Sequence, residues 1–121
     1  MRKLLMFTAL AEGATGAALL LDPSIIVKLL FGEVVSGAGA AMARLAGMCL
    51  VALAVACRPG GELRRGVHGM LSWSVGAAVY LAVIGIGGKA GVLLWPMVCV
   101  HAVLSALFGG GLIRQQKSNG Q

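Results

Sequence analysis

The sequence predicts an all-α membrane protein: a bundle of four transmembrane helices with a short interfacial helix between the first and the second. Four uninterrupted apolar stretches fill most of the 121 residues, and each is about long enough to cross the roughly 30 Å hydrocarbon core as a helix. Hydrophobic residues make up 59% of the chain and charged residues only 12%, which is unlike a soluble domain. Because no stretch resembles an interdomain linker, residues 1–121 are expected to form a single membrane domain.

The four expected spans cover residues 4–21, 38–57, 67–86 and 91–113. The first follows Arg2 and Lys3 as in a signal peptide, but it contains Glu12 and its apolar run continues to Leu21, so we expect it to be retained. Trp95-Pro96, near the start of the fourth, is typical of an aromatic anchor followed by an early-helix proline. The polar segment 115–121 is expected to be a disordered tail.

A short extra helix is predicted between the first two spans. Asp22 can cap a helix whose first residue is Pro23, and Gly32 provides a stop after the apolar run 25–31. At roughly nine residues this helix is too short to cross the bilayer. We expect it to lie at the membrane surface or to enter the bilayer only partway.

Basic residues gather on one side of the predicted topology. The side that holds both termini has seven: Arg2, Lys3, Arg58, Arg64, Arg65, Arg114 and Lys117. The opposite side has Lys28 and Lys89, accompanied by Asp22 and Glu33. Lys and Arg are retained in the cytoplasm, so we predict a multi-pass membrane protein with both termini cytoplasmic. This topology accounts for the net charge of +6 without a nucleic-acid partner.

Four polar side chains, one from each span, are predicted to lie at similar depth: Glu12, Arg44, Tyr80 and His101. They are six to ten residues from the outer ends of their spans, hence within about 6 Å of one another along the membrane normal at roughly 1.5 Å per residue. A charged group at the centre of a span costs about 2.5 to 3.5 kcal/mol, so such groups usually turn inward and pair. We therefore expect a polar cluster in which Glu12 and Arg44 form a buried ion pair.

Two interpretations of this pair stay open. A structural pair would fix the order and register of the helices. A functional pair would respond to protons or to a ligand. Small residues at four-residue spacing would permit close helix packing or dimerisation in either case, and they occur on the first two spans: Ala9, Gly13 and Ala17, and Gly39, Ala43 and Gly47.

The sequence carries no catalytic motif, and it predicts no enzyme, no cofactor and no metal site. A Gly-rich phosphate loop, a nucleophile elbow and a His-Glu metal motif are all missing. Cys99 and His101 are two residues apart and so lie on roughly opposite faces of a helix, where they cannot make a metal pair by themselves. His68 and His101 differ by roughly 13 Å in depth, which excludes them as the two axial ligands of one haem.

Several short motifs resemble those of small, largely uncharacterised bacterial four-helix membrane proteins, broadly DoxX-like in size. These motifs are residues 10–16, Asp22-Pro23, residues 30–32, residues 43–47, and Leu94-Trp95-Pro96 with His101. The resemblance implies a bacterial inner-membrane location and no established activity. The chain is also similar to small multidrug resistance transporters, through Leu10-Ala11-Glu12 in the first span and Trp73. It departs from them at the Asp22-Pro23 helix, at Arg44 and at His101.

The predicted function is that of a packing or binding module in the inner membrane, or of a small subunit of a membrane complex. The expected partners are the lipid bilayer and either a second copy of the chain or the subunits of a larger complex. The sequence does not identify a small-molecule ligand. The alternative is a small proton-coupled transporter that works through Glu12.

Overall fold

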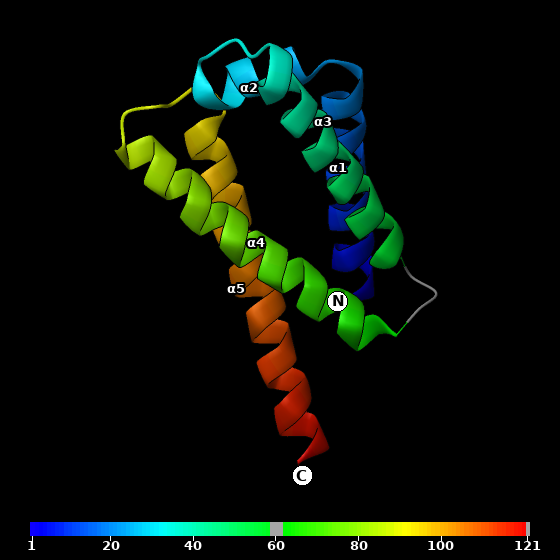
Figure 1. Cartoon of the computed structure of the whole chain (residues 1–121). Coiled ribbons are helices and arrows are strands. Elements are labelled where there is room, and N and C mark those ends of the chain that lie inside the picture. Colours follow the sequence, from blue (N-terminus) through cyan, green and yellow to red (C-terminus); the bar gives the residue numbers. More distant parts are fainter. Residues whose placement is uncertain (59–61, 121) are drawn as a thin grey trace.

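The computed structural model describes residues 1–58 and 62–120, and this part of the chain folds into five α-helices (Figure 1). Their bounds are α1 Arg2–Leu21, α2 Pro23–Phe31, α3 Gly37–Ala56, α4 Leu63–Ile86 and α5 Leu94–Asn119. The all-α prediction is confirmed. By length and hydropathy, α1, α3, α4 and α5 could each cross a membrane, and α2 is the predicted short helix between the first two long ones.

The ends of α2 form as the sequence predicts. The Asp22 carboxylate accepts a hydrogen bond from the backbone N–H of Ser24 at 3.1 Å, and Pro23 occupies the first helical position. Gly32 ends the helix in the left-handed conformation, with φ of 74°. A side chain would be strained there, so glycine is the residue that lets the helix stop.

The four long helices form two pairs. α1 packs along α3, and α4 packs along α5, while contacts between the pairs are few (Figure 1). The pairs meet near both chain termini, where a buried apolar cluster joins all four helices: Leu5, Ala9, Cys57, Val67, Met70 and Phe108. From this terminal end the α4–α5 pair diverges from the α1–α3 pair, and α2 lies across the opposite end, the α2 end (Figure 1).

Two glycines allow α1 and α3 to touch through their backbones. A Cβ placed on Gly16 would lie 2.6 Å from the carbonyl oxygen of Gly47, and a Cβ on Gly47 would lie 2.7 Å from the carbonyl oxygen of Gly16. A third glycine, Gly13, lies against Ala54 of α3. Small residues let membrane helices approach closely and gain packing contacts. The expected close approach at Gly47 is thus present within one chain.

The segment between α4 and α5 holds α2 in place. The N–H groups of Gly91 and Leu93 donate to the carbonyl oxygens of Leu30 and Leu29, each at 2.8 Å. These carbonyls belong to the last turn of α2 and would otherwise lack helical partners. The α2 end is therefore closed by backbone hydrogen bonds that join the two helix pairs.

The C-terminal segment differs from the prediction. Residues 115–119, expected to be disordered, continue α5 to Asn119, while Gln121 lies outside the described residues. Arg, Gln and Lys have good helix propensity, and no proline interrupts the segment. Lys117 in the last turn also lies where a positive charge complements the helix dipole.

The outer surface of the bundle is strongly apolar. Large hydrophobic side chains such as Phe7, Leu10 and Val83 are more than 60% exposed. Such a continuous apolar surface is typical of contact with lipid. The terminal end holds both chain termini, the C-terminal end of α3 and the N-terminal end of α4 (Figure 1). The seven basic residues belong to these segments, so they gather there.

Candidate functional site

A cavity of about 410 Å³ lies between the two helix pairs, and we call it the Glu12 cavity. Apolar side chains of α2 close it on one side: Ile26, Val27, Leu30 and Phe31. Its polar lining comes from α1, α4 and α5: Glu12, Thr15, Ser72, Trp73, Tyr80 and His101. A mostly apolar cavity with a few convergent polar groups is the usual form of a small-molecule site.

Glu12 lies on the polar side of α1, and its side chain lines the Glu12 cavity. Thr8 and Thr15 share this side, and both hydroxyls donate to backbone carbonyls of their own helix, Thr8 to Leu4 at 3.0 Å and Thr15 to Ala11 at 3.0 Å. The threonines are thus satisfied locally, as is common in apolar helices. An ionised Glu12 carboxylate cannot make such a bond, because it has no hydrogen to donate to a carbonyl oxygen. Its polar neighbours are therefore the groups that line the cavity.

The Trp73 indole of α4 lies beside the Glu12 carboxyl, and both side chains line the cavity. The indole also meets the ring of His101, from α5, edge to face, with ring centroids 6.4 Å apart and an interplanar angle of 85°. Trp73 therefore links the acid on α1 to the imidazole on α5. The three residues come from three helices and from both pairs, so this contact depends on how the pairs are placed.

His101 is 96% buried, and its Nδ1 atom has no hydrogen-bond partner among the described residues. The backbone carbonyl of His101 accepts a hydrogen bond from the Ser105 hydroxyl at 2.7 Å. The imidazole ring takes no part in that bond. A buried polar atom without a partner costs about 1 to 3 kcal/mol. Burial of His101 therefore costs folding free energy, which a partner for Nδ1 would partly recover.

Tyr80 lines the same cavity, but its side chain is 64% exposed. It lies two helical turns from Trp73 on the same face of α4, with Gly76 and Ala77 between them. Tyr80 thus stands at the rim of the cavity and Trp73 deeper in it. The small residues between the two aromatic rings leave the space that the cavity occupies.

The predicted ion pair between Glu12 and Arg44 is absent. The Arg44 side chain is exposed and does not line the cavity, and the ion pairs in residues 1–58 and 62–120 are Glu62 with Arg65 and Glu33 with Lys89. Ala46 does line the cavity, and Arg44 is two residues away from it, on nearly the opposite face of α3. A long Arg side chain can also reach the membrane surface along its aliphatic stem, so it needs no partner in the interior.

The structure thus brings three of the four predicted site residues, Glu12, Tyr80 and His101, to one cavity and leaves Arg44 outside it. From the sequence, Trp73 is expected to be a core or belt residue and to carry part of a resemblance, but not to belong to the site, although it lies beside both Glu12 and His101. A signal for it was present: Trp73, Gly76, Ala77 and Tyr80 form a stripe in which two aromatic residues flank two small ones on one helical face.

In residues 1–58 and 62–120, no three His, Cys, Asp or Glu side chains are grouped so that they could hold a metal ion. The amino-acid sequence matches no protein-family model and no curated protein, and the chain matches no solved structure.

Proposed function

We propose that this protein is a binding module of the bacterial inner membrane and that the Glu12 cavity takes a small hydrophobic molecule with one polar group. The observation that carries the proposal is that a carboxyl group lies in an apolar bundle beside a cavity, without a cationic partner in the described residues. Such a group is costly in a membrane, and a structural role would reduce the cost by pairing. A role in binding explains why it is present without a pair.

The membrane placement is supported by four long apolar helices and an apolar outer surface. We place the terminal end in the cytoplasm because seven basic residues gather there. The α2 end then faces the other side of the membrane, with α2 near the headgroups. In this orientation the Glu12 cavity lies toward the outer half of the bilayer.

The chemistry of the cavity favours binding over catalysis. The Glu12 carboxyl can accept a hydrogen bond from a hydroxyl or amine, and the buried Nδ1 of His101 lacks a partner. The apolar wall of α2 would hold a hydrocarbon part of the same molecule. A bound molecule could thus satisfy polar groups that the protein leaves unpaired.

Filling the cavity tests this proposal. A Cβ on Gly76 would meet no atom within 4 Å although Gly76 lines the cavity, so Gly76→Leu should fill the space without disturbing the helices. A matched control is Gly109→Leu, because Gly109 is equally open and lies outside the cavity. The probe is 12-bromododecan-1-ol, whose bromine quenches tryptophan on contact. Trp95→Phe serves as the background, so that Trp73 alone reports.

In nanodiscs we expect saturable quenching of Trp73 in the background protein and in Gly109→Leu, added to the linear quenching that follows partition into lipid. Gly76→Leu should show the linear part only. Saturable quenching of equal size in Gly76→Leu would refute binding in this cavity. Circular dichroism of all three proteins checks that the helices are intact.

A second candidate is a proton-coupled transporter that uses Glu12, and the position of Arg44 favours it. An Arg beside Glu12 would compete with a cationic substrate, but Arg44 is exposed and outside the cavity. The few contacts between the helix pairs also leave room for them to move relative to each other. In proteoliposomes with an imposed pH gradient, a transporter should accumulate ethidium, and Glu12→Gln should abolish the uptake. Equal uptake by both proteins would reject this candidate.

A further inference from the structure

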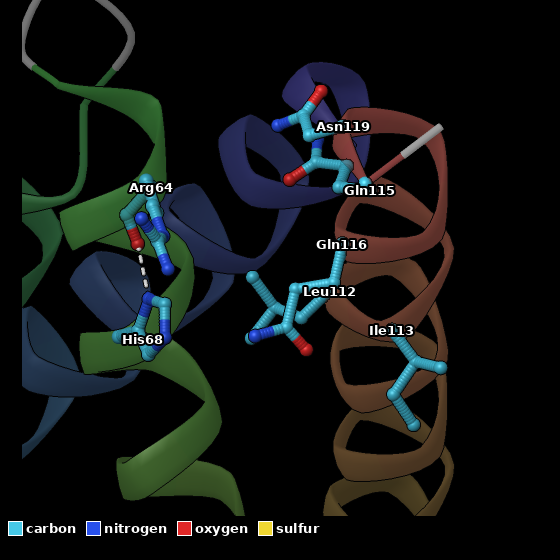
Figure 2. A pocket seen from close by; sticks show the side chains of 8 residues that line it. Arg64, His68, Leu112, Ile113, Gln115, Gln116 and Asn119 are labelled. Carbon is cyan, nitrogen blue, oxygen red and sulfur yellow. Dashed lines mark hydrogen bonds between the residues drawn. The ribbon is translucent and has the colours of Figure 1, made fainter.

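A second cavity, of about 510 Å³, lies at the terminal end between the first turns of α4 and the last turns of α5 (Figure 2). It shares no lining residue with the Glu12 cavity. Arg64 and His68 form its α4 side, and Figure 2 shows the amide side chains of Gln115, Gln116 and Asn119 extending toward them from α5. We call it the Arg64 cavity.

The Arg64 cavity carries positive charge. Arg64 has no carboxylate partner in residues 1–58 and 62–120, because the nearby Glu62 pairs with Arg65 at 2.9 Å. No acidic side chain lines the cavity, and Arg65 does not line it either. One guanidinium therefore faces this space with its hydrogen-bond donors unused by carboxylates.

Three side-chain amides supply hydrogen-bond donors to the cavity, whereas the Nδ1–H of His68 is used by its own helix. The Nδ1 of His68 lies 2.7 Å from the carbonyl oxygen of Arg64 (Figure 2). A carbonyl oxygen can only accept, so Nδ1 must carry the hydrogen, and this bond fixes the ring. The side-chain amides of Gln115, Gln116 and Asn119 each add an NH₂ group with two donors.

The cavity lies where the apolar part of α5 gives way to its polar part. Leu112 and Ile113 line it and end the apolar run, and every residue of 114–119 is polar. In a bilayer this boundary is the level at which acyl chains meet the headgroups. The cavity thus offers an apolar floor, a cation and amide donors at headgroup height.

We propose that the Arg64 cavity binds the phosphodiester headgroup of an anionic phospholipid. Guanidinium donates two parallel hydrogen bonds to phosphate oxygens, and the amides can donate to the remaining phosphate and glycerol oxygens. Its volume lies within the range of about 300 to 1,000 Å³ that is typical of small-molecule sites. The proposal rests on the membrane location of the chain but does not depend on what the Glu12 cavity binds.

The test is native mass spectrometry of the full chain in detergent, titrated with phosphatidylglycerol or phosphatidylcholine. Arg64→Gln should weaken retention of phosphatidylglycerol about tenfold, which is about 1.4 kcal/mol. The matched control is Arg65→Gln, which removes the same charge one residue away, outside the cavity, and should change retention less than twofold. Arg64→Lys should fall between them, because it keeps the charge but loses the bidentate geometry.

Three results would overturn the proposal. Equal losses in Arg64→Gln and Arg65→Gln would show that lipid is held by overall charge and not by the cavity. Equal retention of phosphatidylcholine and phosphatidylglycerol by the native chain would remove the selectivity for anionic lipid. Displacement of phosphatidylglycerol by millimolar inorganic phosphate, with the same dependence on Arg64, would make the site one for free phosphate. Gly76→Leu should leave lipid retention unchanged, which separates this site from the Glu12 cavity.

Discussion

The contact between α1 and α3 and the contact between the two helix pairs are built in different ways. α1 and α3 approach so closely at Gly16 and Gly47 that neither position has room for a Cβ. The pairs, in contrast, meet mainly through the buried cluster at the terminal end and through α2 at the other, with the Glu12 cavity between. The α1–α3 pair therefore supplies a closely packed wall, whereas the junction between the pairs supplies the space and the polar groups.

This division follows from residue size. Glycine removes side-chain volume where two backbones must touch, and it leaves no gap behind because the neighbouring helix fills it. At Gly76, a Cβ would meet nothing within 4 Å, so the same residue type leaves open space. One residue type therefore closes one contact and opens the other, according to what lies opposite.

The largest effect is expected from Gly47→Leu. The new Cβ would lie 2.7 Å from the carbonyl oxygen of Gly16 and 2.9 Å from the Cβ of Leu19, so α1 and α3 would have to separate. We expect loss of most folded protein from detergent extracts, measured by size-exclusion chromatography. The milder Gly47→Ala should lose about 1 to 3 kcal/mol. Gly109→Leu, at an open position, is the control and should behave like the native chain.

If Gly47→Leu folded as well as Gly109→Leu, the close contact would not be what holds α1 to α3. The two contacts of the bundle would then be alike in strength, and the rigid wall would have to come from elsewhere. Chemical cross-linking between α1 and α3 in both variants would show whether the pair had in fact separated.

A smaller effect is expected from Gly91→Ala, which acts on the junction between the pairs. A Cβ on Gly91 would collide with the carbonyl oxygen of Leu29, in the last turn of α2. The hydrogen bond from Gly91 N–H to Leu30 would weaken, and α2 would be held less firmly. We expect hydrogen exchange in α2 to accelerate about tenfold, corresponding to about 1.4 kcal/mol of local opening free energy.

Lys89→Ala provides the comparison for this variant. It removes the 3.3 Å ion pair with Glu33, in which both side chains are more than half exposed. Exposed pairs contribute about 0 to 1 kcal/mol, so exchange in α2 should change little. Faster exchange in Lys89→Ala than in Gly91→Ala would show that charge, and not the backbone contact, holds α2.

Much of the fold could be predicted from the sequence because it depends on local patterns. Continuous hydrophobicity identified four long helices, and Asp22, Pro23 and Gly32 identified the ends of α2. The end of α5 could not be found in the same way. A polar segment at the end of a chain can extend a helix or remain unordered, and its good helix formers here extend the helix to Asn119.

The candidate site could be predicted only in part, because depth and direction are separate properties. Counting residues gives the depth of a side chain in the membrane, and Glu12, Tyr80 and His101 do line one cavity. The same count says nothing about which way a side chain faces around its helix. Arg44 has a suitable depth, but its side chain is exposed and does not line the cavity, to which α3 contributes Ala43, Ala46 and Leu50.

The smallest effect is expected from a double-mutant cycle of Glu12 and Arg44. The two residues form no ion pair, and Arg44 lies outside the cavity that Glu12 lines. Glu12→Leu should not destabilise the protein, since it removes a buried carboxyl that lacks a cation, and Arg44→Leu should have an independent effect. The coupling free energy from thermal unfolding in detergent should then be below about 0.5 kcal/mol. A coupling of about 3 kcal/mol or more is what a buried pair would give when one partner is orphaned. Such a value would indicate that Arg44 pairs with Glu12 at the junction between the helix pairs. The Glu12 carboxyl would then have a structural role and would no longer support the proposal of ligand binding.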